Sequence, residues 1–255
     1  MKITNSSFDY DSQDHNYPAI RRADPRIEMV VRRSLDGCDT ILNVGAGTGS
    51  YEPEDKFVIA VEPSAVMRAK RLVLGRHPAV NAMADDLPFD DRSFDAVMAV
   101  LTIHHWPDLK SGLLEIKRVS KKKISILTYD PDTLDIFWNA KYFPQLIDIE
   151  RSRYPKLDHI AECLGEEITI TNIKIPFDCT DGFQEAFYGR PEAFLLEEVR
   201  KAQSAWGFLD KETERTYVQR LSDDLASGEW DRLYGYHRRL PEFEGAFRLL
   251  EVDLL

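Results

Sequence analysis

The feature that most constrains this chain is a glycine-rich turn placed directly after a short apolar run. Thr40–Val44 has the character of a buried strand, and Gly45, Gly47 and Gly49 follow it at alternate positions. Glycines there let the backbone approach a ligand closely at the carboxyl edge of a sheet. An ordinary strand-to-helix turn does not need three alternating glycines. The pattern therefore predicts a ligand-binding loop after a first strand.

Alternating strand and helix signals surround this turn. Phe57–Val61, Phe94–Val100 and Ile124–Tyr129 are short apolar runs typical of buried parallel strands, and helices are expected after the capping residues Asp24, Ser64 and Asp108. Strands that alternate with helices imply right-handed crossovers. The predicted fold class is α/β, with a Rossmann-like, doubly wound, mostly parallel seven-stranded sheet.

The 255 residues are expected to form a single domain without an internal linker. Residues 1–39 are assigned to an N-terminal helical cap and residues 40–130 to a cofactor-binding core. Residues 131–255 are assigned to a helical substrate cap, with strands near 168–177 and 247–253 that return to the sheet.

Composition and charge exclude several kinds of partner. Lys and Arg total 33 against 44 Asp and Glu, a net charge of −11 that disfavours nucleic acid and anionic membranes. Cys38, Cys163 and Cys179 are far apart and show no metal-binding spacing, which favours a reducing cytoplasm. The longest apolar run, Ala96–Ile103, is far shorter than the ~20 residues of a membrane span. We expect a cytoplasmic protein with no bound metal, and its oligomeric state stays open.

An acidic residue ends the second predicted strand. Glu62 follows Val61, where a carboxylate can accept hydrogen bonds from both hydroxyls of a ribose. The alternative is a solvated glutamate at a strand end. Beside the glycine turn, Glu62 predicts a nucleoside-containing ligand.

The glycine spacing indicates which nucleoside. In the dinucleotide fingerprint the third glycine comes three places after the second and opens a helix that faces a pyrophosphate. Here Gly49 comes two places after Gly47, and Ser50–Asp55 contains three carboxylates and a proline. S-adenosylmethionine carries no phosphate and needs no helix dipole, so this loop favours it over NAD.

Five segments, including the glycine-rich turn and the segment around Glu62, carry a resemblance to a known family. Ile41–Gly49, Val61–Ser64, Ala84–Phe89 with Ser93–Val97, and Leu101–Trp106 resemble motifs of the class I S-adenosylmethionine-dependent methyltransferases. As a set, they resemble the type 11 branch, which includes ubiquinone/menaquinone-methyltransferase-like enzymes that act mostly on small molecules. The resemblance covers about residues 10–130.

The resemblance implies a set of cofactor-binding residues. Two positions depart from the family pattern: Asn43 stands where an acidic residue is usual, and Met83 stands where many relatives carry an adenine-binding aspartate. The implied residues are Gly45, Ala46, Gly47 and Gly49 at the methionine part with Asn43 beside them, Glu62, Pro63 and Ser64 at the ribose, Met83, Ala84 and Asp85 at adenine, Leu101 and Thr102 beneath the sulfonium, and Tyr17 and Arg21 closing over the cofactor.

Three residues that follow predicted strands are candidates for a general base. His104 and His105 follow the fourth strand, where a histidine could deprotonate a hydroxyl or an amine. The alternative is that His105 braces the loop. Asp130, at the end of the next strand, could also be a base, or it could cap the following helix.

Aromatic residues of the C-terminal half offer an acceptor pocket, although at helical spacing such residues more often form the core. These residues are Trp138, Tyr142, Phe143, Tyr234 and His237.

The sequence therefore predicts a methyltransferase that transfers a methyl group from S-adenosylmethionine to an O, N or C atom of a small molecule, leaving S-adenosylhomocysteine. One alternative is a protein that binds S-adenosylmethionine without methyl transfer. A less favoured alternative is an NAD-dependent oxidoreductase.

Overall fold

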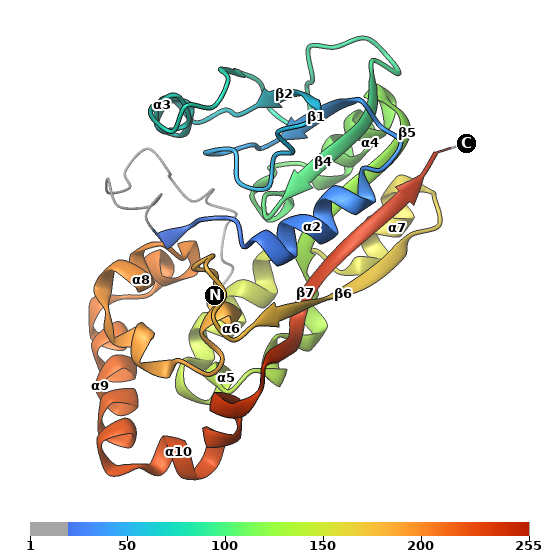
Figure 1. Ribbon diagram of the computed structural model, residues 1–255. Coiled ribbons are helices and arrows are strands. Elements are labelled where there is room, and N and C mark those ends of the chain that lie inside the picture. The colour runs from blue at the N-terminus through green and yellow to red at the C-terminus, as the bar shows by residue number, and fades with distance from the viewer. Residues whose placement is uncertain (1–19, 255) are drawn as a thin grey trace.

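The computed structural model describes residues 20–254, which contain a seven-stranded sheet in the order β3-β2-β1-β4-β5-β7-β6 (Figure 1). Strands β1 to β5 pair in parallel, whereas β7 pairs antiparallel with both β5 and β6. The strands are β1 (Thr40–Val44), β2 (Phe57–Val61), β3 (Ala79–Val80), β4 (Phe94–Val100), β5 (Ser120–Tyr129), β6 (Thr169–Pro176) and β7 (Glu242–Asp253). The predicted mostly parallel seven-stranded sheet is confirmed.

Alternation of side chains along the strands produces a core on each face of the sheet. On β4, Ala96 and Met98 join one core, and Val97 and Ala99 join the other. Helix α2 (Pro25–Ser34) packs on the first face, while α4 (Leu109–Val119) and α7 (Leu157–Leu164) pack on the second (Figure 1).

Helix α2 begins where the sequence predicts it. The carboxylate of Asp24 accepts a hydrogen bond from the Arg26 backbone N–H, which caps the helix. Its buried residues Ile27 and Val31 contact the sheet core. This described part of the expected N-terminal cap therefore belongs to the sheet layers, because its apolar face is covered by β5 and β6.

Apart from α3 (Ala65–Val73), which follows β2, the remaining helices form a cap at one end of the sheet (Figure 1). Its aromatic core is continuous with the first sheet core, and it contains Trp138, Tyr142 and Phe143 at 2% exposure or less. The cap helices are α5 (Asn139–Tyr142), α6 (Pro144–Arg153), α8 (Glu197–Lys201), α9 (Lys211–Ser227) and α10 (Glu229–Tyr234), joined by 3-10 turns η3 (Pro131–Ile136), η4 (Gln184–Phe187), η5 (Pro191–Leu195), η6 (Ser204–Phe208) and η7 (Gly235–Arg239).

The strand order places a topological switch point between β1 and β4. From β1 the chain moves outward to β2 and β3, and it then returns to the other side of β1 with β4. In open α/β sheets, ligands bind in the crevice at the carboxyl ends of the strands at such a point. The glycine loop after β1 and the segment after β4 meet there. No helix within residues 20–254 is long and apolar enough to cross a membrane.

Candidate functional site

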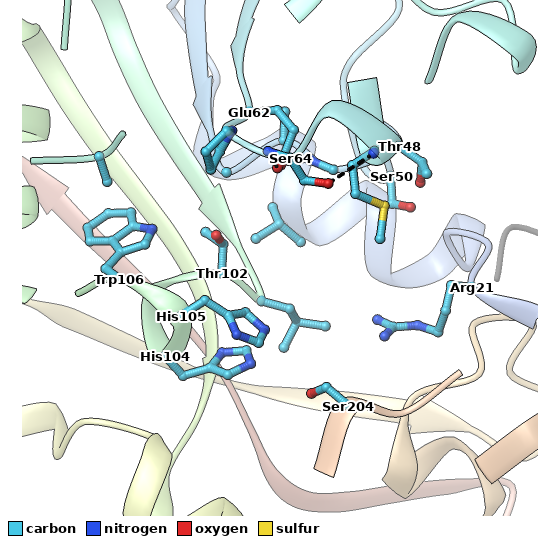
Figure 2. A pocket seen from close by; sticks show the side chains of 18 of the residues that line it. Arg21, Thr48, Ser50, Glu62, Ser64, Thr102, His104, His105, Trp106 and Ser204 are labelled. Atoms are coloured by element: carbon cyan, nitrogen blue, oxygen red, sulfur yellow. Dashed lines mark hydrogen bonds between the residues drawn. The ribbon is translucent and has the colours of Figure 1, made fainter. Parts of the chain in front are cut away.

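A cavity of about 470 Å³ opens at the switch point. Glu62 and Ser64 lie at one end, His104, His105 and Ser204 lie at the other, and the Arg21 guanidinium points in from the side (Figure 2). The first end is built by the loops after β1 and β2, and the second by the loops after β4 and β5 together with the cap. The volume is in the range typical of small-molecule sites.

The glycine loop approaches the segment after β4 so closely that a side chain at Gly45 has no room. Gly45 has φ +68°, and a Cβ there would lie 1.9 Å from Thr102 Oγ1. Gly47 lines the cavity with no atom within 4 Å of its Cβ position. Gly49 does not line the cavity, and its Cβ position faces Arg71 and Glu52 instead. Gly47 therefore leaves the cavity open, whereas Gly45 and Gly49 allow the loop to pack closely against its neighbours.

Glu62 lies at the cavity wall as predicted, and its carboxylate also shapes the loop. Oε2 accepts a hydrogen bond from the Gly47 N–H at 2.7 Å, and Oε1 accepts one from the Ser64 N–H at 2.8 Å. Burial raises the pKa of Glu62, and the two backbone donors partly offset this. Each carboxylate oxygen has further lone pairs for a hydroxyl of a ligand. Glu62 thus joins the ends of β1 and β2 around the cavity.

Asn43 replaces the usual acidic residue, and the structure shows what holds it. Its amide Nδ2 donates to Glu52 Oε1 at 2.8 Å, and Glu52 in turn accepts two hydrogen bonds from Arg71 at 2.7 and 2.6 Å. All three side chains are buried. Asn43 Oδ1 is buried without a hydrogen-bond partner among the described residues. This orientation presents an acceptor oxygen at a position that lines the cavity.

The acidic loop after Gly49 is electrostatically neutralised. Besides Glu52 with Arg71, Glu54 pairs with Arg76 and Asp55 pairs with Arg32. Each of the three carboxylates after Gly49 is therefore matched by an arginine, so the loop carries less negative charge than its own sequence indicates. The glycine spacing and Pro53 remain the features that favour S-adenosylmethionine over NAD.

Arg21 is held in place by a buried carboxylate of the cap. Its Nε donates to Asp181 Oδ1 at 2.7 Å, and the Tyr51 hydroxyl donates to Asp181 Oδ2 at 2.9 Å. Tyr51 is itself buried in the left-handed region, with φ +64°. Asp181 thus ties the N-terminal segment to the glycine loop and the cap. Tyr17 lies outside the described residues.

Of the other predicted cofactor residues that the structure describes, all except Asp85 line the cavity. Leu101 lines it in a strained conformation with φ +49°. The cavity is lined by Ala46, Pro63, Ser64, Met83, Ala84 and Thr102 as well.

His104 and His105 form the far wall, and both residues are half-buried. Burial and the neighbouring Arg153 lower the pKa of His105 to about 3, and burial lowers the pKa of His104 well below its usual value. Arg153 Nη2 lies 3.4 Å from His105 Nδ1. Since a guanidinium only donates, Nδ1 accepts and the His105 proton resides on Nε2. His105 is therefore equipped to donate a hydrogen bond from Nε2 at neutral pH.

The low pKa of His105 predicts a specific loss of stability in acid. Between about pH 6.5 and pH 3 the unfolded chain binds a proton at this residue and the folded protein does not, so the folded state loses stability as pH falls. Replacing His105 with Gln should remove about 2 kcal/mol of acid destabilisation between pH 7 and pH 5. Urea unfolding of both proteins at each pH measures this difference, and parallel pH profiles would contradict it.

Asp130 is not brought to the cavity. Its carboxylate accepts from the Asp132 N–H and caps η3, as the alternative interpretation expected, and it lies 3.8 Å from Arg248. The aromatic candidates also lie elsewhere, because the cap needs them for its core. Trp138, Tyr142, Phe143, Tyr234 and His237 are absent from the cavity lining.

Several cavity residues escaped the sequence interpretation. Tyr129 ends β5 immediately before Asp130, so the rule that carboxyl ends of strands meet could have found it. Glu150, Tyr154 and Gln184 come from α6, its C-terminal end and η4. No motif marks these three, because only the folding of the cap brings them to the sheet.

Comparison with known proteins supports the same family. A family model described as a methyltransferase domain matches residues 42–127. A solved structure from Anabaena variabilis, described as a candidate methyltransferase from an antibiotic biosynthesis pathway, is 30% identical with a TM-score of 0.85. The match covers 93% of this chain and 100% of that chain.

Two curated relatives match over shorter segments. The ubiquinone/menaquinone biosynthesis C-methyltransferase of Citrifermentans bemidjiense is 30% identical over 130 residues, which cover 45% of this chain and 55% of that protein. The malonyl-acyl-carrier-protein O-methyltransferase of Halorhodospira halophila is 29% identical over 106 residues, which cover 37% of this chain and 36% of that protein. The chain spans about half the length, or less, of these two relatives.

The full-length structural match, the domain match and the glycine loop with Glu62 agree with one another. This chain belongs to the class I S-adenosylmethionine-dependent methyltransferases, in the type 11 branch.

Proposed function

We propose that this protein transfers a methyl group from S-adenosylmethionine to a small molecule. The observation that carries the proposal is a single cavity that joins the glycine loop and Glu62 to a polar, aromatic far end. One ligand can therefore lie against the loop while a second lies against the cap. Bound S-adenosylmethionine supplies an electrophilic methyl group at the junction of the two.

The residues at the loop end fit this cofactor. Asn43 Oδ1, buried without a partner among the described residues, is an acceptor suited to the cofactor's ammonium group. Glu62 has lone pairs suited to the ribose hydroxyls, and Arg21 is suited to the methionine carboxylate. Gly47 leaves the space that a side chain would fill, and Gly45 lets the loop lie directly against Thr102.

At the far end the residues orient the acceptor and exclude water. Alignment of the acceptor atom with the methyl group supplies much of the acceleration in such a transfer. Aromatic rings enclose this end: His104 stacks on Tyr154 at 4.1 Å, and Tyr154 meets the edge of Tyr129 at 5.3 Å.

The test of the proposed function is calorimetric titration with S-adenosylhomocysteine, with NAD as the control. We expect micromolar binding of the first and none of the second. Binding of NAD alone, or of neither compound, would contradict the proposal. Methyl transfer is then followed with radiolabelled S-adenosylmethionine and candidate acceptors.

Replacing Glu62 with alanine should weaken S-adenosylhomocysteine binding by about 1–3 kcal/mol, since a charge-assisted hydrogen bond to the ligand is lost. Loss of the Gly47 and Ser64 contacts should lower the melting temperature as well. Glu54→Ala is the matched control, because Glu54 is an exposed carboxylate of the loop between β1 and β2 and does not line the cavity. Unchanged affinity in folded Glu62→Ala protein would overturn the ribose assignment.

A further inference from the structure

The far end of the cavity contains buried polar atoms that the described protein leaves unsatisfied. Tyr129 Oη, His104 Nδ1 and Gln184 Nε2 have no hydrogen-bond partner among residues 20–254, and all three residues line the cavity. Buried polar groups in proteins are nearly always paired, with protein, water or ligand. These three atoms therefore indicate where a polar ligand lies.

Glu150 is the charged group at this end. It lies on α6, is 8% exposed and lines the cavity. Its Oε2 accepts a hydrogen bond from Arg153 Nη1 at 3.2 Å, and its other oxygen accepts none from the described residues. The second carboxylate of the cavity differs, because Glu62 accepts a backbone N–H on each oxygen. Glu150 thus presents an acceptor oxygen at the far end of the cavity.

The cations of the cavity wall already have carboxylate partners. Arg21 pairs with Asp181 at 2.7 Å, and Lys201 pairs with Glu197 at 3.1 Å. Arg153 divides its donors among Glu150, His105 and Ser204 Oγ. The far end therefore favours a ligand that donates hydrogen bonds over one that carries a carboxylate or a phosphate.

Resting on the proposed function, we propose that Glu150 is the catalytic residue that binds and deprotonates the methyl acceptor, and that this acceptor is a small amine or hydroxyl compound. The acceptor's N–H or O–H donates to the free oxygen of Glu150. As the acceptor's lone pair forms the new bond to the methyl carbon, the carbon–sulfur bond breaks and its electron pair returns to sulfur. The acceptor's proton passes to the Glu150 carboxylate, and the sulfonium becomes a neutral thioether.

Other side chains suit this role less well. His105 has its Nδ1 engaged by Arg153 and its proton on Nε2, so it offers no basic nitrogen. Asp130 caps η3 outside the cavity. Burial raises the pKa of the Glu150 carboxyl group, which the neighbouring Arg153 partly offsets, and a raised pKa suits proton transfer.

The test uses the full-length protein saturated with S-adenosylhomocysteine and a set of small probes screened by ligand-observed NMR. The set holds equal numbers of amines, phenols and alcohols, carboxylates, and compounds without N–H or O–H groups. Glu150→Gln keeps the volume of the side chain and removes its charge. Glu185→Gln is the matched control, because Glu185 is a buried carboxylate that accepts from the Ala246 N–H and does not line the cavity.

We expect amines and hydroxyl compounds to bind the wild-type protein and Glu185→Gln, and to bind Glu150→Gln at least tenfold more weakly. With radiolabelled S-adenosylmethionine, the bound probes should be methylated, at a rate at least about a hundredfold lower in Glu150→Gln. Four results would each overturn the proposal. Carboxylates or compounds without donors could bind in preference, the probes could bind Glu150→Gln as tightly as the wild-type protein, no probe could bind, or the bound probes could remain unmethylated. Calorimetry with S-adenosylhomocysteine distinguishes failure of the proposed function from failure of the role of Glu150. If the wild-type protein does not bind S-adenosylhomocysteine, the proposed function is wrong. If both the wild-type protein and Glu150→Gln bind it, a negative result in the probe experiments concerns Glu150 alone.

Discussion

Replacing Glu52 with alanine is expected to lower the free energy of unfolding by about 3–5 kcal/mol, the cost of leaving a buried charge without its partner. The charge is that of Arg71, which is 1% exposed and donates two hydrogen bonds to Glu52. Asn43 Nδ2 loses its acceptor in the same variant, so binding of S-adenosylhomocysteine should weaken too. Urea unfolding measures the first effect and calorimetry the second.

Two further variants make this prediction specific. Glu54→Ala removes the ion pair between Glu54 and Arg76 in the same loop, in which the charged atoms are 3.5 Å apart and the Glu54 side chain is 79% exposed. Because the pair is exposed, its loss should lower the free energy of unfolding by less than about 1 kcal/mol. Replacing Glu52 and Arg71 together with Leu and Met should recover much of the stability, because no buried charge is then left unpaired. A loss below about 1 kcal/mol in Glu52→Ala would show that Arg71 finds another partner or reaches water.

Replacing Gly45 with alanine is expected to abolish measurable cofactor binding and to destabilise the protein by about 2–5 kcal/mol. The left-handed backbone costs about 1–2 kcal/mol for a residue with a Cβ, and the contact with Thr102 adds the cost of overpacking, about 1–3 kcal/mol. The Cβ would meet Thr102 Oγ1 at 1.9 Å, so the loops after β1 and β4 would have to separate. Calorimetry with S-adenosylhomocysteine and urea unfolding provide the two measurements.

The chain contains a matched control for the backbone term. Gly37 has φ +77°, close to that of Gly45, but nothing lies within 4 Å of its Cβ position. Gly37→Ala should therefore cost only the backbone term and leave binding unchanged. Adding Thr102→Ala to Gly45→Ala should restore part of the stability, because it removes the clashing Oγ1. Equal losses in Gly37→Ala and Gly45→Ala would contradict the role of the close contact.

The sheet was predictable from local patterns. Thr40–Val44, Phe57–Val61 and Phe94–Val100 have the predicted bounds, since buried parallel strands are short apolar runs between turn signals. The helix N-caps at Asp24, Ser64 and Asp108 could also be predicted, because a capping side chain accepts hydrogen bonds from backbone N–H groups within three residues along the chain.

The loop end of the site was also predictable in large part. Residues after β1, β2 and β4 meet because the carboxyl ends of parallel strands share one edge, so Gly45, Glu62 and Thr102 lie together as expected. The charges of the same loop were not predictable. Composition shows three carboxylates after Gly49, but only the fold brings Arg71, Arg76 and Arg32 to them.

By itself, the sequence determined the α/β sheet and predicted residues that the fold gathers at the loop end of the cavity, because these depend on periodicity and on spacing within one strand–loop unit. Only the tertiary structure decided which groups face the second ligand. Glu150 and Gln184 are far from the motifs in the chain, and Trp138, which resembles a pocket residue in sequence, lies in the cap core. The burial and hydrogen bonding of a side chain depend on contacts between distant segments, and these contacts leave no local pattern in the sequence.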